Sequence, residues 1–263
     1  MIAFITDWGE DSYYVSSVKS VIKNINKNAE IIDITHNMGK YDIYSYSHIL
    51  LRASKEFQEN TIFLVVIDPT VGSSRKAILV ETNQPKYYFI APDNGILTQV
   101  KRKYGINKII ELNNKNYFWK ESNTFHGRDI FGAFAAYLSK NINFKYFGNE
   151  LLKINELNIK NPFYNKNNII GHFLYKDSFG NLETDVENNN TFNFDKHSSY
   201  VISFEGKEYP LNYKEYYSEC GDDKLLMHFD SSNYLEISIY KGSAASYLNI
   251  KNFNTKFEIK KIK

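Results

Sequence analysis

The run TIFLVVI at residues 61–67 decides the fold class, because it is continuously apolar after its first residue, rich in β-branched side chains, and ends at Asp68. Such a run is typical of a strand that is buried on both faces of a parallel sheet. Two strand-like runs precede it, IAFIT at 2–6 and AEIIDIT at 29–35, and apolar residues at helical spacing follow each of them. This alternation predicts an α/β domain with a largely parallel sheet.

The same organisation continues as far as residue 152 and then changes. KAILVET and KYYFIA predict two more strands, and apolar residues repeat at every fourth position from Ile130, as in a helix. Residues 153–168 lose this periodicity and are expected to be a linker. From 169 to 263, short alternating runs are broken by Gly, Asn and Asp, which predicts an all-β, barrel-like domain. We therefore expect an N-terminal domain over 1–152 and a C-terminal domain over 169–263.

Composition and charge narrow the class of protein. With 43% apolar residues in 263, the chain can bury a substantial core without a metal or disulfide. Lys and Arg total 32 against 30 Asp and Glu, and no basic stripe is visible, so a nucleic acid is not an expected partner. Cys220 is the only cysteine, which excludes an intrachain disulfide and fits a reducing, cytoplasmic location. The first residues reach Asp7 too early for a signal peptide or a membrane span, so no membrane partner is expected.

Polar residues follow several of the predicted strands. Asp7 closes the first strand, Asp68 closes the 61–67 strand, and Asp93 with Asn94 follows KYYFIA. Ligands of open parallel sheets bind beyond the carboxyl ends of the strands, so these side chains are expected to line one rim. The alternative for any single Asp is a helix cap or a turn.

Asp68 is the strongest candidate of this group. Pro69 disfavours a helix cap there, and the following loop, TVGSSRK, brings Arg75 back toward the same edge. A carboxylate held by a guanidinium stays ionised near neutral pH, because the nearby positive charge favours the charged form. Such a carboxylate can accept a hydrogen bond from water.

The stretch NTFHGRDIFG places His126 directly before a predicted helix. This imidazole is either a structural residue at the helix start or a chemical group. Gly127 permits close approach of another backbone or a ligand, and Arg128 with Asp129 is expected to form a local structural pair. No ligand set accompanies His36 and His126, so no metal site is predicted.

A second polar loop, KDSFGNLETD, lies in the all-β half. Gly180 predicts a β-turn. Phe179 could stack on a flat ring, and Asn181 could present both a donor and an acceptor to the edge of a heterocycle.

Taken together, these segments resemble the S-adenosyl-L-methionine (SAM) hydroxide adenosyltransferase family, also called adenosine-forming SAM hydrolases, which is related to fluorinase and chlorinase. The resemblance runs nearly from end to end, through ITDWGEDSYYVSSVKS, DITHNM, VVIDPTVGSSRK, APDNGIL, TFHGRDIFGAFAA, DSFGNLETD and YLEISIYKGSAA. It implies an α/β domain and a C-terminal β-barrel, in a homotrimer whose active sites lie between the N-terminal domain of one subunit and the C-terminal domain of the next. It also implies hydrolysis of SAM to adenosine and L-methionine, with attack at the ribose C5′, possible selectivity for one sulfonium epimer, and no cofactor.

The resemblance assigns roles to individual residues. Its catalytic Asp, Arg and His fall on Asp68, Arg75 and His126, and His126 would help to position and deprotonate a water. The implied substrate-binding residues are Asp7 for the ribose, Phe179 and Asn181 for the adenine, Asp177 for the methionine amino group, and Ser231, Glu236 and Ile239 in the last motif. Departures from the family pattern occur at Ser12, Thr70, Lys76 and Asp185, where the family has Asp, Gly, Arg and Asn.

Two other functions stay open at this point. The related halogenases have Tyr where this chain has Asp68, and Tyr-Ser where it has His126 and Gly127. An anionic carboxylate repels a halide, so these residues favour an oxygen nucleophile over halide transfer. The other alternative is a non-catalytic module that binds SAM or adenosine.

Overall fold

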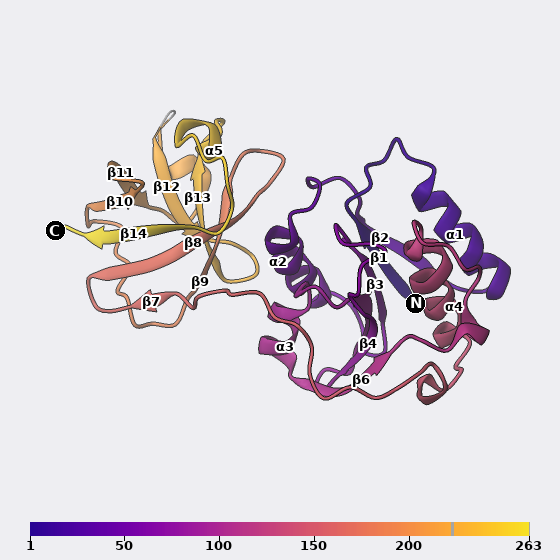
Figure 1. The fold of residues 1–263 in the computed structure, drawn as a ribbon. Coiled ribbons are helices and arrows are strands. Elements are labelled where there is room, and N and C mark those ends of the chain that lie inside the picture. The colour runs from indigo at the N-terminus through magenta and orange to yellow at the C-terminus, as the bar shows by residue number, and fades with distance from the viewer. Residues whose placement is uncertain (222–223, 263) are drawn as a thin grey trace. The chain divides into compact units, whose positions relative to one another are not determined.

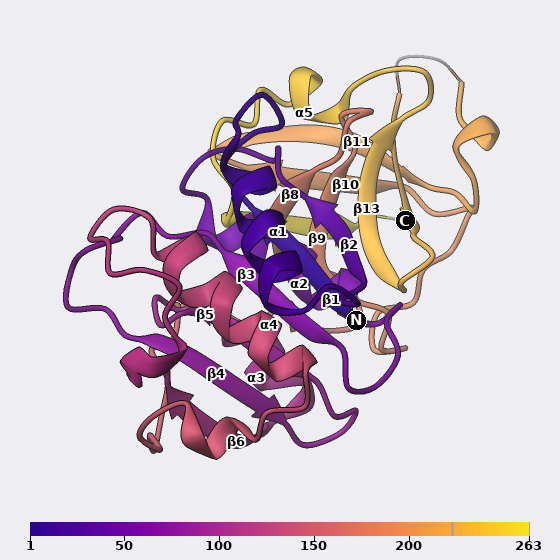
Figure 2. The ribbon, with the colours of Figure 1, turned by 90° about the vertical axis from the view of Figure 1, so that its right-hand side faces the viewer.

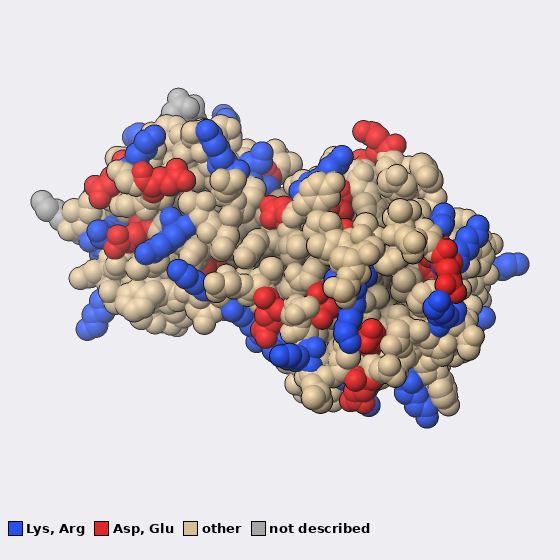
Figure 3. All heavy atoms as spheres, in the orientation of Figure 1, with Lys and Arg blue, Asp and Glu red and all other residues tan. Residues whose placement is uncertain are grey.

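The computed structural model describes residues 1–221 and 224–262, and these form two compact units, Met1–Leu157 and Asn158–Lys263 (Figure 1). The division falls within the segment 153–168 that was expected to be a linker. None of the helices in the described ranges is long and apolar enough to cross a membrane. Basic and acidic side chains are interspersed on the face of each unit that Figure 3 shows.

The first unit is built on a six-stranded sheet in the order β2-β1-β3-β5-β4-β6. The strands β1, β2, β3 and β5 pair in parallel, whereas β4 runs antiparallel to both β5 and β6. The expectation of a largely parallel sheet is therefore confirmed. The sequence patterns did not predict β6. The strands are β1 (Ile2–Thr6), β2 (Ile31–Thr35), β3 (Ile62–Val66), β4 (Ala77–Thr82), β5 (Tyr88–Pro92) and β6 (Ile106–Glu111).

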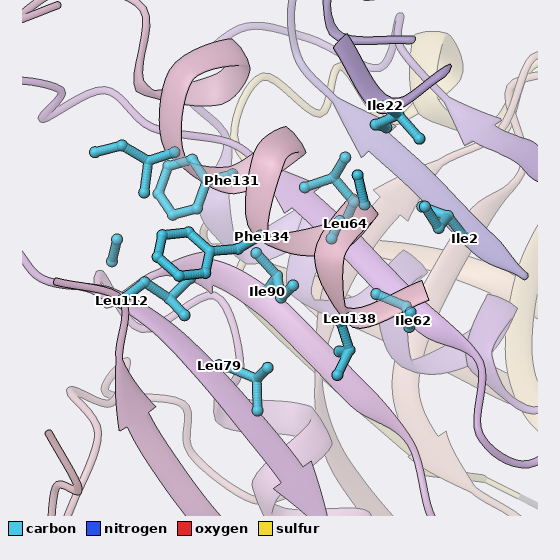
Figure 4. Packing of buried hydrophobic residues seen from close by; sticks show 14 of the residues in the cluster. Ile2, Ile22, Ile62, Leu64, Leu79, Ile90, Leu112, Phe131, Phe134 and Leu138 are labelled. Carbon is cyan, nitrogen blue, oxygen red and sulfur yellow. The ribbon is translucent and has the colours of Figure 1, made fainter. Parts of the chain in front are cut away.

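Helices cover both faces of this sheet (Figures 1 and 2). One face packs against α1 (Tyr14–Ile25) and α4 (Ala133–Ser139), and the other against α2 (Ile43–Ser54) and α3 (Thr98–Tyr104). Figure 4 shows the first of these cores, in which Phe131 and Phe134 lie over the sheet. The wholly buried strand β3 separates the two cores, as its unbroken apolar run predicts. Short helices are η1 (Lys115–Tyr117), η2 (Gly127–Gly132) and η3 (Phe144–Tyr146).

The second unit is a closed β-barrel, as expected. Its strand order is β14-β10-β11-β12-β13-β9-β8, and β14 pairs with β8 to close the ring, while the short β7 also pairs with β8. Alternate apolar side chains of these strands fill the interior. Its elements are β7 (Phe163–Tyr164), β8 (Asn168–Lys176), β9 (Leu182–Glu187), β10 (Tyr200–Phe204), β11 (Lys207–Tyr213), η4 (Tyr217–Glu219), β12 (Leu225–Phe229), β13 (Tyr234–Ile239), α5 (Ala244–Tyr247) and β14 (Thr255–Lys261).

Candidate active site

The carboxyl ends of β1 and β3 bring two carboxylates to one rim of the first unit. Asp7 directly follows β1, and its Oδ2 accepts a 3.0 Å hydrogen bond from the backbone N–H of Tyr41. Burial raises the pKa of Asp7, backbone hydrogen bonds partly offset that effect, and the negative charge of Asp68 adds to it. The two carboxylates are therefore close enough for their charges to interact, which the adjacency of β1 and β3 explains.

Asp68 and Arg75 form a buried, two-pronged ion pair. Arg75 Nε lies 2.9 Å from Oδ1 and 3.0 Å from Oδ2 of Asp68, and Arg75 Nη2 also donates to Oδ2. Only 7% of the Arg75 side chain and 6% of the Asp68 side chain are exposed. A guanidinium fork held in this way fixes the plane of the carboxylate as well as its charge. The loop between β3 and β4 thus returns Arg75 to the rim, as the sequence predicted.

His126 completes this cluster. Its Nδ1 lies 2.9 Å from Arg75 Nη2. A guanidinium has only donors, so Nδ1 must accept, and in the neutral ring the proton is then on Nε2. Burial and the positive charge of Arg75 lower the pKa of His126, and the carboxylates of Asp68 and Asp129 and a hydrogen bond to the Ser122 backbone oppose this shift only in part. Arg75 therefore contacts both of the other residues with predicted catalytic roles, the Asp68 carboxylate and the neutral imidazole of His126.

Local packing after His126 explains its position. The chain enters the π-helix η2 there, and Gly127 is buried against the indole ring of Trp8: a Cβ on Gly127 would lie 2.6 Å from that ring. The neighbour that requires this glycine is therefore a side chain of the same unit, whereas the sequence suggested another backbone or a ligand. The pairing of Arg128 with Asp129 is confirmed, with N–O distances of 2.7 and 3.0 Å to a fully buried carboxylate.

Asp93 and Asn94 lie at the same edge of the sheet, as expected, but their side chains bond to other partners than Asp68, Arg75 and His126. The Asp93 carboxylate accepts hydrogen bonds from the backbone N–H and the Nδ2 of Asn155, at 2.8 and 3.0 Å. Asn94 Nδ2 donates to the carbonyl of Ile67. Asp93 thus ties the segment after residue 150 to the end of the sheet, and Asn94 ties the end of β5 to the end of β3. A cavity of about 730 Å³ lies beside them and reaches Arg75.

His36 also lies near the rim but has structural partners. Its Nδ1 is 2.9 Å from Thr6 Oγ1, and its ring packs edge-on against Phe4. Among residues 1–221 and 224–262, His, Cys, Asp and Glu side chains form no group of three or more that could hold a metal ion.

The second unit contains an open pocket of about 610 Å³. Four predicted binding residues line it, together with four that were not predicted: Asp177, Phe179, Asn181 and Ile239, with Tyr217, Tyr240, Lys241 and Gly242. Phe179 is 78% exposed and lines this pocket, so its ring is available to stack on a ligand.

The loop that presents Phe179 is held by Asp177. Its Oδ1 accepts from the backbone N–H groups of Phe179 and Asn181 at 2.9 and 2.8 Å, and its Oδ2 accepts from Asn181 Nδ2 at 2.9 Å. The β-turn predicted at Gly180 is confirmed by the 3.1 Å bond from Gly180 N to Asp177 O. Gly180 has φ of +89°, and a Cβ there would lie 2.2 Å from Ser243 Oγ, so no other residue fits this turn without displacement.

Glu236 and Ser231 lie outside this pocket lining. Glu236 is buried in the middle of β13, and its carboxylate is hydrogen-bonded to neighbouring side chains of the same unit. Ser231 is exposed in the turn before β13, whereas Ile239 is at the other end of that strand. At about 3.3 Å per residue the strand is roughly 16 Å long, so Ser231 and Ile239 do not meet.

Sequence reasoning missed Trp8 and the pocket residues Tyr217, Tyr240, Lys241 and Gly242. Trp8 stands next to Asp7 in the quoted DWG motif, so proximity in the chain was an available signal. Tyr217 lies in a stretch rich in polar and aromatic residues, where neither periodicity nor spacing distinguishes it from its neighbours.

Comparison with known proteins supports the geometry of both units. The profile of the SAM hydroxide adenosyltransferase N-terminal domain matches residues 2–148, and that of the C-terminal domain of the same family matches residues 171–255. The chain belongs to the SAM hydroxide adenosyltransferase family.

Relatives within and near this family cover most of the chain. It is 34% identical to the (R)-S-adenosyl-L-methionine hydrolase of Methanocaldococcus jannaschii, over 95% of this chain and 92% of that protein. It is 22% identical to a fluorinase of Nocardia brasiliensis, over 71% of each chain. A solved structure of an uncharacterized conserved protein from Thermotoga maritima is 39% identical and superposes with a TM-score of 0.93, over 98% of this chain and 99% of the other.

Proposed function

We propose that this chain hydrolyses SAM to adenosine and L-methionine through attack of a water-derived nucleophile at the ribose C5′. The observation that carries the proposal is the contact of Asp68, Arg75 and His126 at the rim of the sheet. Membership of the adenosyltransferase family and the names of the hydrolase relatives support it. The printed name of these relatives also leads us to propose a preference for the (R) sulfonium epimer.

In this mechanism Asp68 accepts the proton of the attacking water. The new bond joins the water oxygen to C5′, the C5′–S bond breaks with its electron pair passing to sulfur, and methionine leaves as a neutral thioether. The Asp68 carboxylate is held in one orientation by Arg75, so its remaining lone pairs can align the water before attack. The reaction needs no cofactor, since water is the nucleophile and SAM carries its own leaving group.

The contact with Arg75 changes the role that the resemblance suggested for His126. Its Nδ1 is occupied as an acceptor, so this nitrogen is not free to take a proton from water. We propose that the neutral ring orients Arg75 through Nδ1 and so keeps the Asp68 carboxylate aligned with the oxygen nucleophile. Proton transfer is then the task of Asp68 alone.

Binding of the nucleoside is assigned to both units. We propose that Asp7 holds the ribose hydroxyls, that Phe179 stacks on the adenine with Ile239 beside it, and that Asn181 bonds to the edge of the base. Asp177 would attract the methionine amino group by its charge while it also holds the loop. A contact between Ser231 and the substrate stays a prediction from the resemblance.

The resemblance further leads us to propose a homotrimer in which each active site combines the first unit of one subunit with the second unit of its neighbour. Light scattering after gel filtration measures the mass directly. Mixing Asp68→Ala subunits with Phe179→Ala subunits tests the sharing of sites. Mixed trimers would contain some sites with neither substitution and recover activity, whereas sites made within one subunit would show no recovery.

Composition and charge bear on the cellular location and the partners of the protein. We propose a cytoplasmic enzyme that acts on a small molecule and has neither a nucleic acid nor a membrane as its partner. The single cysteine and the near balance of basic and acidic residues support this proposal.

The deciding experiment incubates the purified protein with each SAM epimer and follows adenosine by chromatography. Adenosine release from the (R) epimer, lost in Asp68→Ala while adenosine still binds, is the expected result. Binding without release at any pH, from either epimer, would leave only a binding module. Formation of 5′-chloroadenosine in the presence of chloride would show halide transfer instead.

A further inference from the structure

The pocket of the second unit includes a tyrosine whose position depends on a long connection. Tyr217 lies in η4, between β11 and β12, which pair in parallel and therefore need a crossover. Side chains on such connections are mobile unless another group anchors them. A side chain that forms part of a binding pocket needs that anchor, because ordering it on binding would weaken affinity.

A buried carboxylate supplies the anchor. Tyr217 Oη donates to Glu236 Oε1 at 2.8 Å, and Ser238 Oγ donates to the same oxygen at 2.6 Å. His228 Nε2 lies 3.0 Å from that oxygen as well. Three donors thus converge on one atom of a residue that is only 5% exposed.

His228 holds the tyrosine in a second way. It is the cross-strand partner of Glu236 on β12 and β13, so both side chains project from the same face of the sheet. The rings of Tyr217 and His228 pack edge to face, with centroids 4.5 Å apart and an interplanar angle of 73°. The phenol ring and its hydroxyl are therefore fixed by two adjacent strands.

The charge state of this cluster strengthens the anchor. Burial opposes ionisation of Glu236, but the hydrogen bonds from His228, Ser238 and Tyr217 outweigh it and lower the pKa of that carboxyl. Burial and the bond to Glu236 raise the pKa of Tyr217, so its hydroxyl stays protonated and donates. Hydrogen bonds to a carboxylate are about twice as strong as neutral ones.

We propose that Glu236 is a positioning residue, which holds Tyr217 in the pocket beside Phe179 and so sets the affinity of this pocket for a purine nucleoside. The inference rests on the proposed function for the identity of the ligand. Glu236 acts through the tyrosine and does not touch the substrate, in contrast to the ligand contact that the resemblance implied. His228 supports the same tyrosine from the neighbouring strand.

Calorimetric titration with adenosine tests this in the full-length protein. Tyr217→Phe should raise the Kd for adenosine about tenfold or more, as expected from loss of a hydrogen bond to a charged group, and Glu236→Gln should raise it by a smaller factor, because the amide oxygen is a weaker acceptor than the carboxylate. The KM for SAM should rise in parallel while kcat changes by less than about twofold, because the groups that act on C5′ lie in the other unit. The double variant should bind no more weakly than Tyr217→Phe alone, since the residue at 236 acts on the pocket only through the hydroxyl that phenylalanine lacks.

Tyr240→Phe provides the matched control. Tyr240 lines the same pocket, so the change also removes one phenol hydroxyl there, but Tyr240 is not among the donors to Glu236 Oε1. The change that Tyr240→Phe causes in the binding free energy of adenosine, whatever its size, should add to the change caused by Glu236→Gln. If Tyr217→Phe and Glu236→Gln instead changed the binding free energy of adenosine additively, the inference would be overturned.

The test remains decisive even if one of the variants fails to fold. If Glu236→Gln unfolds the barrel, Tyr217→Phe still tests the anchor, because it leaves the carboxylate with its other donors; an unchanged Kd in that variant overturns the inference. Adenosine binding and turnover by the unmodified protein with no effect of Tyr217→Phe would refute this inference alone. No binding of adenosine by the unmodified protein would refute the proposed function and this inference together.

Discussion

Arg75 Nη2 donates to His126 Nδ1 across 2.9 Å, in a cluster where the same guanidinium also holds Asp68. Because a guanidinium has only donors, this contact requires an unprotonated Nδ1. The neutral imidazole therefore contacts the same guanidinium that holds Asp68, and Asp68 is the one group of the three that combines negative charge with acceptor atoms.

Asp68→Asn should reduce adenosine formation by about 10²- to 10⁴-fold, the usual contribution of a positioned general base. Its Kd for adenosine should change little. Asp93→Asn is the matched control, because it makes the same change at the end of a neighbouring strand, where the carboxylate binds Asn155. Turnover per folded molecule should survive there; equal losses in both variants would contradict the assignment.

The pH dependence of turnover should reflect the lowered pKa of His126. Burial and Arg75 place it below the ordinary 6.5, so kcat should be insensitive to this group above pH 6.5 and decline only under more acidic conditions. The lowered pKa of His126 should also make the folded state less stable in acid. In acid the unfolded chain binds a proton here before the native state does, so the free energy of unfolding decreases as pH falls from 6.5 toward the native pKa. An acid limb centred above 6.5 would be inconsistent with this arrangement.

His126→Asn separates a bridging role from a basic one. The Asn carbonyl can still accept from Arg75, but an amide cannot take a proton near neutral pH. We expect this variant to retain at least about tenfold more activity than His126→Ala, which loses the acceptor, and to lose the acid limb due to His126. Single-turnover rates of the two variants provide this comparison. If both variants were equally inactive, His126 would have to act as the base.

Phe179→Ala should weaken adenosine binding by about tenfold or more, the usual loss when a stacked aromatic is removed from a base. Phe179 is 78% exposed, so the melting temperature should hardly change. Phe163→Ala removes another exposed phenylalanine of the same unit, 53% exposed and outside the pocket lining. Similar binding losses in the two variants would argue against stacking at Phe179.

Gly180→Ala should destabilise the second unit and weaken adenosine binding together. The substitution meets both a left-handed backbone and Ser243, whereas Gly206→Ala meets a similar φ of +76° with no atom within 4 Å of its Cβ. The φ penalty alone is about 1–2 kcal/mol. Gly180→Ala should therefore lower the melting temperature more than Gly206→Ala, and a smaller effect would show that Ser243 moves aside freely.

Local patterns in the chain determined much of the architecture. The buried run before Asp68 indicated a strand covered on both faces, and the alternation after residue 169 indicated a barrel. The patterns did not reveal β6, whose sequence INKIIE mixes polar and apolar residues without a clear period. Its pairing with β4 came from the tertiary structure.

The sequence by itself placed Asp68, Arg75 and Phe179 in loops after strands, because strand ends and turn residues are encoded by neighbours a few positions away. Only the tertiary structure decided which polar side chains are already occupied by hydrogen bonds within the protein. Asp93 is bound by Asn155, and Glu236 by Tyr217, partners that lie 62 and 19 residues away in the chain. Hydrogen-bond capacity depends on which donors packing brings within 3 Å, and no local pattern carries that information.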